Sequence, residues 1–144
     1  MADAGTHGQQ DDDKLDVAII GGGPAGLSAS IWLGRYLHRV VLVDSGDPRN
    51  WETRGVNGFL GMPGVRPAEL RGRGRDQARD AGATLVDDIC ETVHRIDDET
   101  FELVLASGGR LRARRLLLAI GLRDVWPDIP GLERVYGANA HVCP

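Results

Sequence analysis

The sequence has few cysteines and no long apolar run. Its two cysteines, Cys90 and Cys143, are too few for the disulfide scaffold of a small secreted protein, and they fit a reducing compartment. No apolar run approaches the roughly 20 residues that a helix needs to cross a bilayer, and the polar start lacks the apolar segment of a signal peptide. We therefore expect a soluble, cytoplasmic protein that does not associate with a membrane.

An excess of charge of one sign is also missing. The formal net charge is −4, and the residues after the first fourteen carry 17 acidic and 16 basic side chains. This balance gives no electrostatic reason to expect binding to nucleic acid. The four histidines show no metal-ligand spacing with the cysteines or with one another, so we expect no metal site.

The length of 144 residues is that of one domain. Residues 1–14 are small, polar and acidic without periodicity, and we expect them to be a disordered leader or the remnant of a tag. The folded domain should therefore comprise residues 15–144.

The first part of that domain has the pattern of a β-α-β unit. A short apolar, β-branched run at residues 15–20 predicts a buried parallel strand, and glycines follow it at once. Residues 24–37 open with proline and place apolar side chains at near-helical spacing, which predicts a helix. Residues 40–43, VVLV, predict a second buried strand.

The remaining residues predict a loop, a helix and a meander. Residues 45–65 are rich in Gly, Pro and Asn and should form a long loop that carries function or covers a ligand. A helix should follow over residues 67–81. Residues 83–119 alternate apolar and polar side chains, with a hairpin at Gly108 and Gly109, and return to a buried strand at residues 115–120. The expected fold class is α/β, a Rossmann-like domain with a parallel sheet and an added antiparallel β-meander.

The motif that carries the chemistry is G-x-G-x-x-G, formed by Gly21, Gly23 and Gly26 between the predicted strand and helix. Gly21 permits a tight turn, Gly23 lets the backbone approach a pyrophosphate, and Gly26 lets the helix lie close to the strand. The amino terminus of the helix supplies unpaired N–H groups and a partial positive charge to the phosphates.

An acid at the end of the second strand completes this fingerprint. Asp44 stands there, about 20 residues after the glycines, where it would accept hydrogen bonds from ribose hydroxyls. Its charge would repel a 2′-phosphate, so NADP is disfavoured at this site. The motif alone leaves FAD and NAD open, because both present the same pyrophosphate and ribose.

Three stretches of the sequence carry more information: DVAIIGGGPAGLSASIWLGR, the loop DPRN with NGFLGMPG, and LLLAIG followed by PDIPGL. They resemble signatures of the FAD domain of thioredoxin-reductase-like pyridine nucleotide-disulfide oxidoreductases, from about Asp16 to Pro144. The resemblance implies FAD as the cofactor. In the full-length parent it also implies NADPH, a disulfide substrate such as a thioredoxin-like protein, and a homodimer.

The same resemblance implies further cofactor contacts. The family's second motif is a strand ending in Ala-Thr-Gly, and this sequence has Ala119-Ile120-Gly121, which lacks the threonine hydroxyl. Part of the long loop is expected beside the flavin, and Ile89 near the adenine. The residues expected to bind FAD are Gly21, Gly23, Pro24, Ala25, Gly26, Asp44, Ser45, Arg49, Asn50, Asn57, Ile89, Ala119 and Gly121.

The sequence stops at ANAHVCP, where the family has Cys-Pro-x-Cys, a redox pair that exchanges electrons with the flavin. We therefore expect Cys143 to be the catalytic half of such a pair in the parent protein. The resemblance also implies a nicotinamide-binding domain and a closing segment downstream, so we expect this chain to be the front portion of a longer protein.

Two other functions stay open. A flavin-dependent dithiol oxidase of the same architecture would pass electrons to oxygen, and a non-catalytic nucleotide-binding module would only hold the ligand.

Three other features are predicted to be structural. Arg71, Arg75 and Arg79 lie at i, i+4 spacing and are interpreted as a solvated helix face. Cys90 and Trp32 are expected to be packed inside the domain.

Overall fold

The computed structural model describes residues 14–49, 53–123, 125, 127–136 and 139–140. Its strands form a six-stranded sheet in the order β3-β2-β1-β6-β5-β4. In chain order the elements are β1 Leu15–Ile20, α1 Pro24–Arg35, β2 Val40–Asp44, α2 Pro67–Asp80, β3 Thr84–Asp87, β4 Cys90–Asp97, β5 Thr100–Leu105, β6 Arg110–Leu118 and α3 Leu132–Val135.

The predicted β-α-β unit is present. β1 and β2 are parallel, with Val17 opposite Val40 and Ile20 opposite Val43. The helix between them ends at Arg35, two residues earlier than predicted, and the backbone at Leu37 then takes a positive φ of 64°. Every residue of β2 is buried, which is typical of a strand covered on both faces.

One strand was assigned to the wrong part of the sheet. β3 pairs with β2 in parallel, with Val41 opposite Thr84 and Asp44 opposite Asp87. The sequence predicts this segment in the antiparallel meander, because a four-residue strand is too short for its periodicity to distinguish the two pairings.

The meander itself is confirmed over β4, β5 and β6. β5 and β6 form the predicted hairpin, in which Gly108 has a φ of +87°. β6 is longer than predicted, because it begins at Arg110 rather than Arg115. Ala113 lies opposite Leu15 in the parallel pairing and opposite Phe101 in the antiparallel one, so a single strand joins the two halves of the sheet.

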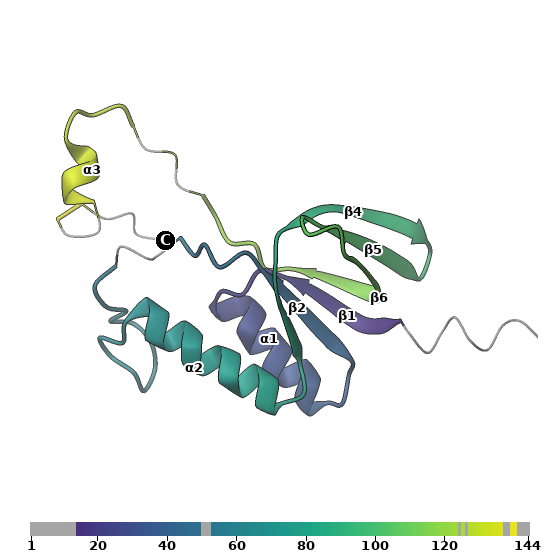
Figure 1. Cartoon of the computed structure of the whole chain (residues 1–144). Coiled ribbons are helices and arrows are strands. Elements are labelled where there is room, and N and C mark those ends of the chain that lie inside the picture. Colours follow the sequence, from purple (N-terminus) through teal and green to yellow (C-terminus); the bar gives the residue numbers. More distant parts are fainter. Residues whose placement is uncertain (1–13, 50–52, 124, 126, 137–138, 141–144) are drawn as a thin grey trace, which may run out of the picture.

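The side chains of the sheet form two cores, one on each face. α1 and α2 lie side by side on one face (Figure 1), where Leu27 and Ala78 pack against Ile19 and Leu42. On the other face, side chains of β1 and β2 pack with those of β5 and β6 in a second cluster: Ala18, Val41, Val43, Leu103, Leu105 and Ala113. The meander thus covers the face of β1 and β2 that the helices leave open.

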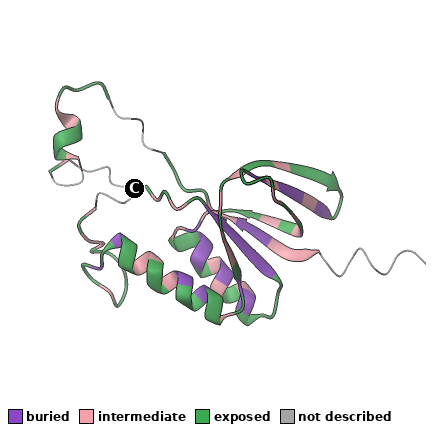
Figure 2. Ribbon diagram, viewed as in Figure 1, coloured by how far each residue is buried: buried purple, intermediate pink, exposed green. Residues whose placement is uncertain are grey.

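The far end of β6 is not buried, which corrects the prediction for residues 115–120. Leu118 is 62% exposed and Ile120 is 69% exposed. Figure 2 shows the contrast between the buried strands in the middle of the sheet and the exposed segment that leads toward α3. β5 pairs with β6 only up to Ala113, so within the described residues the rest of β6 has β1 as its one neighbour.

Residues 1–13, the bulk of the expected leader, lie outside the described residues. No helix in the described part of the chain has the length and apolar character needed to cross a membrane.

Candidate functional site

The glycine-rich turn after β1 is held between β2 and the end of β6. The N–H of Gly21 donates to the carbonyl of Val43 over 2.8 Å, and the φ of Gly21 is +108°, which side-chain-bearing residues rarely adopt. A Cβ at Gly21 would lie 2.3 Å from the carbonyl oxygen of Ala119. The turn therefore has the tight conformation predicted for the first glycine of the motif.

Gly26 brings α1 close to this turn. A Cβ at Gly26 would lie 1.9 Å from the carbonyl oxygen of Gly21, so any side chain there would push the helix away from the strand. This is the close helix–strand packing predicted for the third glycine. Gly22 has a similar restriction that the sequence analysis missed, because a Cβ there would lie 2.1 Å from Oδ2 of Asp44.

The amino terminus of α1 is open. Gly23 is the N-cap residue and Pro24 follows it in the first turn, which has no acidic residue. A Cβ at Gly23 would meet no atom of the described residues within 4 Å, and no described side chain caps the helix. The first N–H groups of the helix therefore have open space before them, where an anion would be stabilised by the helix dipole.

Asp44 ends β2 beside this turn and is only 6% exposed. Its Oδ1 accepts a hydrogen bond from the N–H of Gly46 over 3.1 Å. Its Oδ2 accepts hydrogen bonds from Arg71 and, over 3.2 Å, from Nη1 of Arg75. The carboxylate also accepts from the backbone of Gly22, so it is held between two backbone donors and two guanidinium groups.

These donors set the ionisation of Asp44. Burial raises the pKa of the carboxyl, but the hydrogen bond from the Gly46 backbone and the hydrogen bond and charge of Arg71 lower it more strongly. The pKa of Asp44 therefore lies below its usual range, and the side chain is an ionised acceptor at neutral pH.

The two arginines that contact Asp44 overturn the interpretation of a solvated helix face. Arg75 is only 8% exposed, and its Nη2 also donates to Asp87 over 2.6 Å. Arg79, one turn further along α2, is exposed, as was expected for all three arginines, and it pairs with Asp76. The missed signal was Asp87, an acid at the end of a strand that was not recognised as parallel.

A pocket of about 460 Å³ opens beside the amino terminus of α1. Pro48, Phe59 and Met62 from the long loop line it, so that loop forms one wall, and Gly23 and Pro24 line it from the start of α1. The other lining residues come from α1 and α2: Leu27, Ser28, Ile31, Trp32, Arg35, Pro67, Leu70, Arg71, Arg73, Gly74 and Gln77.

Trp32 lies on this pocket rather than in the core, which corrects the expectation for that residue. Its side chain is 56% exposed, and the guanidinium carbon of Arg35 lies 5.7 Å from its ring centroid. Cys90 lies half-buried at the start of β4, so the expectation that it packs inside the domain is met only in part. Burial raises the pKa of its thiol.

Four other predicted cofactor residues lie in loops. Ser45 and Arg49 follow β2 and are exposed, and Ile89 is exposed between β3 and β4. Asn57 is exposed at a turn whose base is the antiparallel bridge between Val56 and Val65.

The positions after β6 are only partly described. The N–H of Ala119 donates to the carbonyl of Ile20, and Gly121 has a φ of +66°. Asn50 and Cys143 lie outside the described residues.

Comparison with known proteins gives a consistent result. The family model described as pyridine nucleotide-disulphide oxidoreductase matches residues 15–143. The thioredoxin reductase tcpT of Claviceps purpurea is 35% identical over 90% of this chain and 41% of its own.

Solved structures agree with this family match. The oxidoreductase from Agrobacterium tumefaciens is 36% identical with a TM-score of 0.85, over 91% of this chain and 44% of the other. The crystal structure of HlmI is 39% identical with a TM-score of 0.85, over 91% of this chain and 42% of the other.

The chain thus spans about two fifths of the length of these relatives. This coverage agrees with the expectation that it corresponds to part of a longer protein. The predicted resemblance is confirmed, because the family match extends over the whole described domain and the fold is that of the related structures. The chain belongs to the pyridine nucleotide-disulphide oxidoreductase family and is similar to thioredoxin reductases.

Proposed function

We propose that this chain is the FAD-binding part of a flavin-dependent NAD(P)H:disulfide oxidoreductase. The observation that carries the proposal is the convergence of the glycine turn, the uncapped amino terminus of α1 and the ionised Asp44 at one edge of the sheet. In open α/β sheets, ligands bind at the carboxyl ends of the parallel strands, which is where these groups lie.

The residues present suit the ADP half of FAD. The first N–H groups of α1, behind Gly23, would bind the pyrophosphate, and Asp44 would accept hydrogen bonds from the ribose hydroxyls. The loop residues Arg49, Asn50 and Asn57 would lie along the flavin half, with Ile89 near the adenine. Bound FAD supplies the electron transfer, and this chain supplies binding and orientation.

The activity of the whole protein is part of the same proposal. Electrons would pass from NADPH to a disulfide substrate, such as a thioredoxin-like protein, through a dithiol of which Cys143 is one half. A disulfide needs two thiols, so the partner cysteine would lie two residues beyond Pro144. If a chain extended by a few natural residues has no cysteine there, the disulfide-reductase assignment fails.

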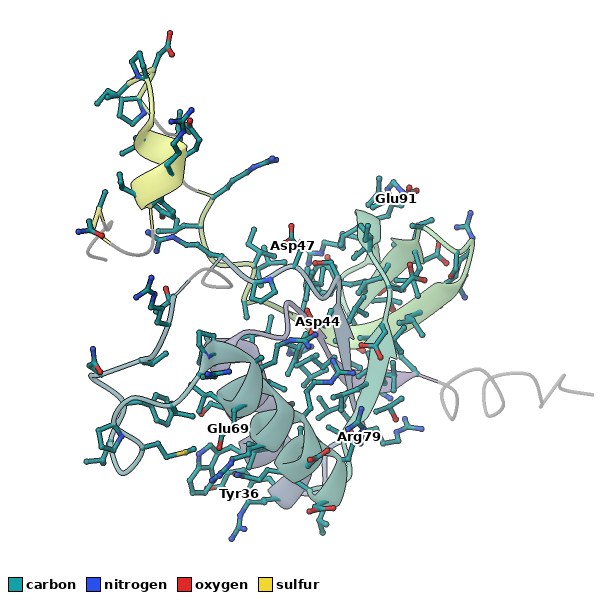
Figure 3. The ribbon with its side chains drawn as sticks, turned by 60° about the vertical axis from the view of Figure 1, so that its left-hand side comes forward. Tyr36, Asp44, Asp47, Glu69, Arg79 and Glu91 are labelled. Carbon is teal, nitrogen blue, oxygen red and sulfur yellow. The ribbon has the colours of Figure 1, made fainter. Side chains whose placement is uncertain are left out.

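Calorimetric titration with ADP and with FAD tests the binding proposal. Asp44→Ala should weaken the binding of both by about 1 to 3 kcal/mol, because the ribose hydroxyls lose their charged acceptor. Asp47→Ala is the matched control, since Asp47 is an exposed acid three residues further on (Figure 3), and it should bind both ligands like the original chain. Equal affinities for all three proteins would remove Asp44 from the site.

A further inference from the structure

Arg75 connects two acidic residues at the ends of neighbouring strands. Its Nη1 lies 3.2 Å from Oδ2 of Asp44, and its Nη2 lies 2.6 Å from Oδ1 of Asp87. Asp44 and Asp87 are register partners in the parallel pairing of β2 and β3. One guanidinium group therefore holds the ends of both strands through separate nitrogen atoms.

The fold explains why Arg75 reaches both acids. Side chains alternate between the faces of a strand, and Leu42 in β2 and Leu85 in β3 pack on the side of the helices. Asp44 and Asp87 each stand two residues later and so lie on the same side. Arg75 is on the buried face of α2, one turn before Ala78 of the same core.

Arg71 contacts Asp44 as well, but it is held differently. Its side chain is 20% exposed, against 10% for Arg75, and its described ion pair is with Asp44 alone. It also lines the pocket beside α1. Arg71 can therefore leave Asp44 for solvent or for a ligand, whereas Arg75 stays bound to Asp87 if its contact with Asp44 is lost.

The difference between Arg71 and Arg75 matters because the Asp44 carboxylate has few acceptor positions. A carboxylate offers about four acceptor positions, and donors from Gly22, Gly46, Arg71 and Arg75 already use those of Asp44. Two ribose hydroxyls need two positions, so at least one present donor must leave. The more exposed, singly anchored Arg71 is the donor that can be exchanged.

We infer that Arg75 is the positioning residue that fixes the Asp44 carboxylate for the ribose, and that Arg71 is the donor that the ribose displaces. This inference rests on the proposed function. It gives Arg75 a role in nucleotide affinity although no contact between Arg75 and the nucleotide is required.

Titration of the whole chain with ADP, after circular dichroism has shown that each variant is folded, tests the division between the arginines. Arg75→Met should weaken ADP binding about tenfold, because Asp44 keeps its charge but loses its fixed orientation. Arg71→Met should change the affinity by about threefold or less, although Arg71 contacts the same oxygen atom. Arg79→Met, the exposed control on the same helix, should bind like the original chain.

A second pair of variants tests the bridge. Asp87→Asn leaves the Arg75–Asp44 pair in place but weakens its outer anchor, and it should reduce ADP affinity by about threefold. The double variant with Arg75→Met should bind no worse than Arg75→Met alone, because both changes remove the same bridge. Additive losses would show that Asp87 acts independently of Arg75.

Arg75→Lys keeps the experiment decisive if Arg75→Met does not fold. Lysine retains the charge, but a single ammonium group cannot donate to both acids as the guanidinium does, so ADP affinity should still fall.

An unchanged ADP affinity in Arg75→Lys, or in a folded Arg75→Met, would overturn the inference. If Asp44→Ala weakens ADP binding in the same series, the proposed function stands while the role of Arg75 is rejected. If Asp44→Ala has no effect, the proposed ribose contact itself fails.

Discussion

β2 and β6 flank β1 on its two sides with the same register, but they are buried to very different degrees. Val17 to Ile20 of β1 lie opposite residues 40–43 of β2 and residues 115–118 of β6. Both strands are rich in Val or Leu there. Yet all of β2 is buried, whereas Leu117 and Leu118 of β6 are exposed.

The difference follows from what lies beyond each strand. β2 has β3 on its outer edge, the helices on one face and β5 on the other. The end of β6 has neither a second strand neighbour among the described residues nor full cover on its faces. Apolar composition therefore predicts a strand, but only the surrounding elements determine whether that strand contributes to the core.

The largest effect should come from truncating a side chain in β2. Leu42 is fully buried between β1, β3 and the helices, so Leu42→Ala should lower the free energy of unfolding by about 2 to 5 kcal/mol. Denaturant unfolding followed by circular dichroism measures this change. Leu118→Ala in β6 is the matched comparison and should cost less than about 0.5 kcal/mol. Similar losses in the two strands would contradict the contrast between them.

A somewhat smaller effect is expected where the helix meets the glycine turn. Gly26→Ala places a methyl group against the carbonyl oxygen of Gly21, and the backbone must shift, at a cost of about 1 to 3 kcal/mol. ADP binding should fall with it, because the turn and α1 move apart. Gly72→Ala is the control, since a Cβ there meets nothing within 4 Å among the described residues. A Gly26→Ala protein with unchanged stability and affinity would show that the close packing is dispensable.

Acid should remove the stabilising contribution of Asp44, at the buried end of β2, in a defined pH range. Because the folded-state pKa of Asp44 is lowered, its ionised form stabilises the fold above the ordinary carboxyl pKa of 3.8. That contribution should be lost as the pH falls below 3.8 through the folded-state pKa. Unfolding of the original chain and of Asp44→Asn, measured from pH 5 to pH 3, should converge as the pH falls. A constant difference over this range would exclude Asp44 from the acid response.

The smallest effect on stability is expected at the exposed edge of β6, where self-association should change instead. An unpaired apolar strand edge favours pairing with another chain, and a lysine there opposes it. Leu118→Lys should change the free energy of unfolding by less than about 0.5 kcal/mol but reduce the concentration-dependent increase in light scattering. Equal association of both proteins would show that this edge is not the contact.

The sequence predicted the elements whose signals are local. The turn at Gly21, the close packing at Gly26 and the acid at the end of β2 lie within 30 residues of β1, and a motif of fixed spacing relates them. The hairpin at Gly108 is local in the same sense, because two glycines interrupt an alternating pattern.

The features that the sequence did not predict depend on long-range pairing. Arg75 looked like one of several equivalent arginines on a helix, and only the parallel pairing of β2 with β3 brings Asp44 and Asp87 together before it. The exposure of Leu118 likewise depends on which strand lies next to β6, and composition does not encode that neighbour.

Competition between ADP and FAD for the unmodified chain tests the central claim most directly. FAD binding is followed by its fluorescence while ADP is added. The account predicts that ADP displaces FAD from one site per chain, because both present the same pyrophosphate and ribose to the amino terminus of α1 and to Asp44. FAD that stays bound at saturating ADP, or a chain that binds neither ligand, would contradict the assignment of this edge of the sheet as the dinucleotide site.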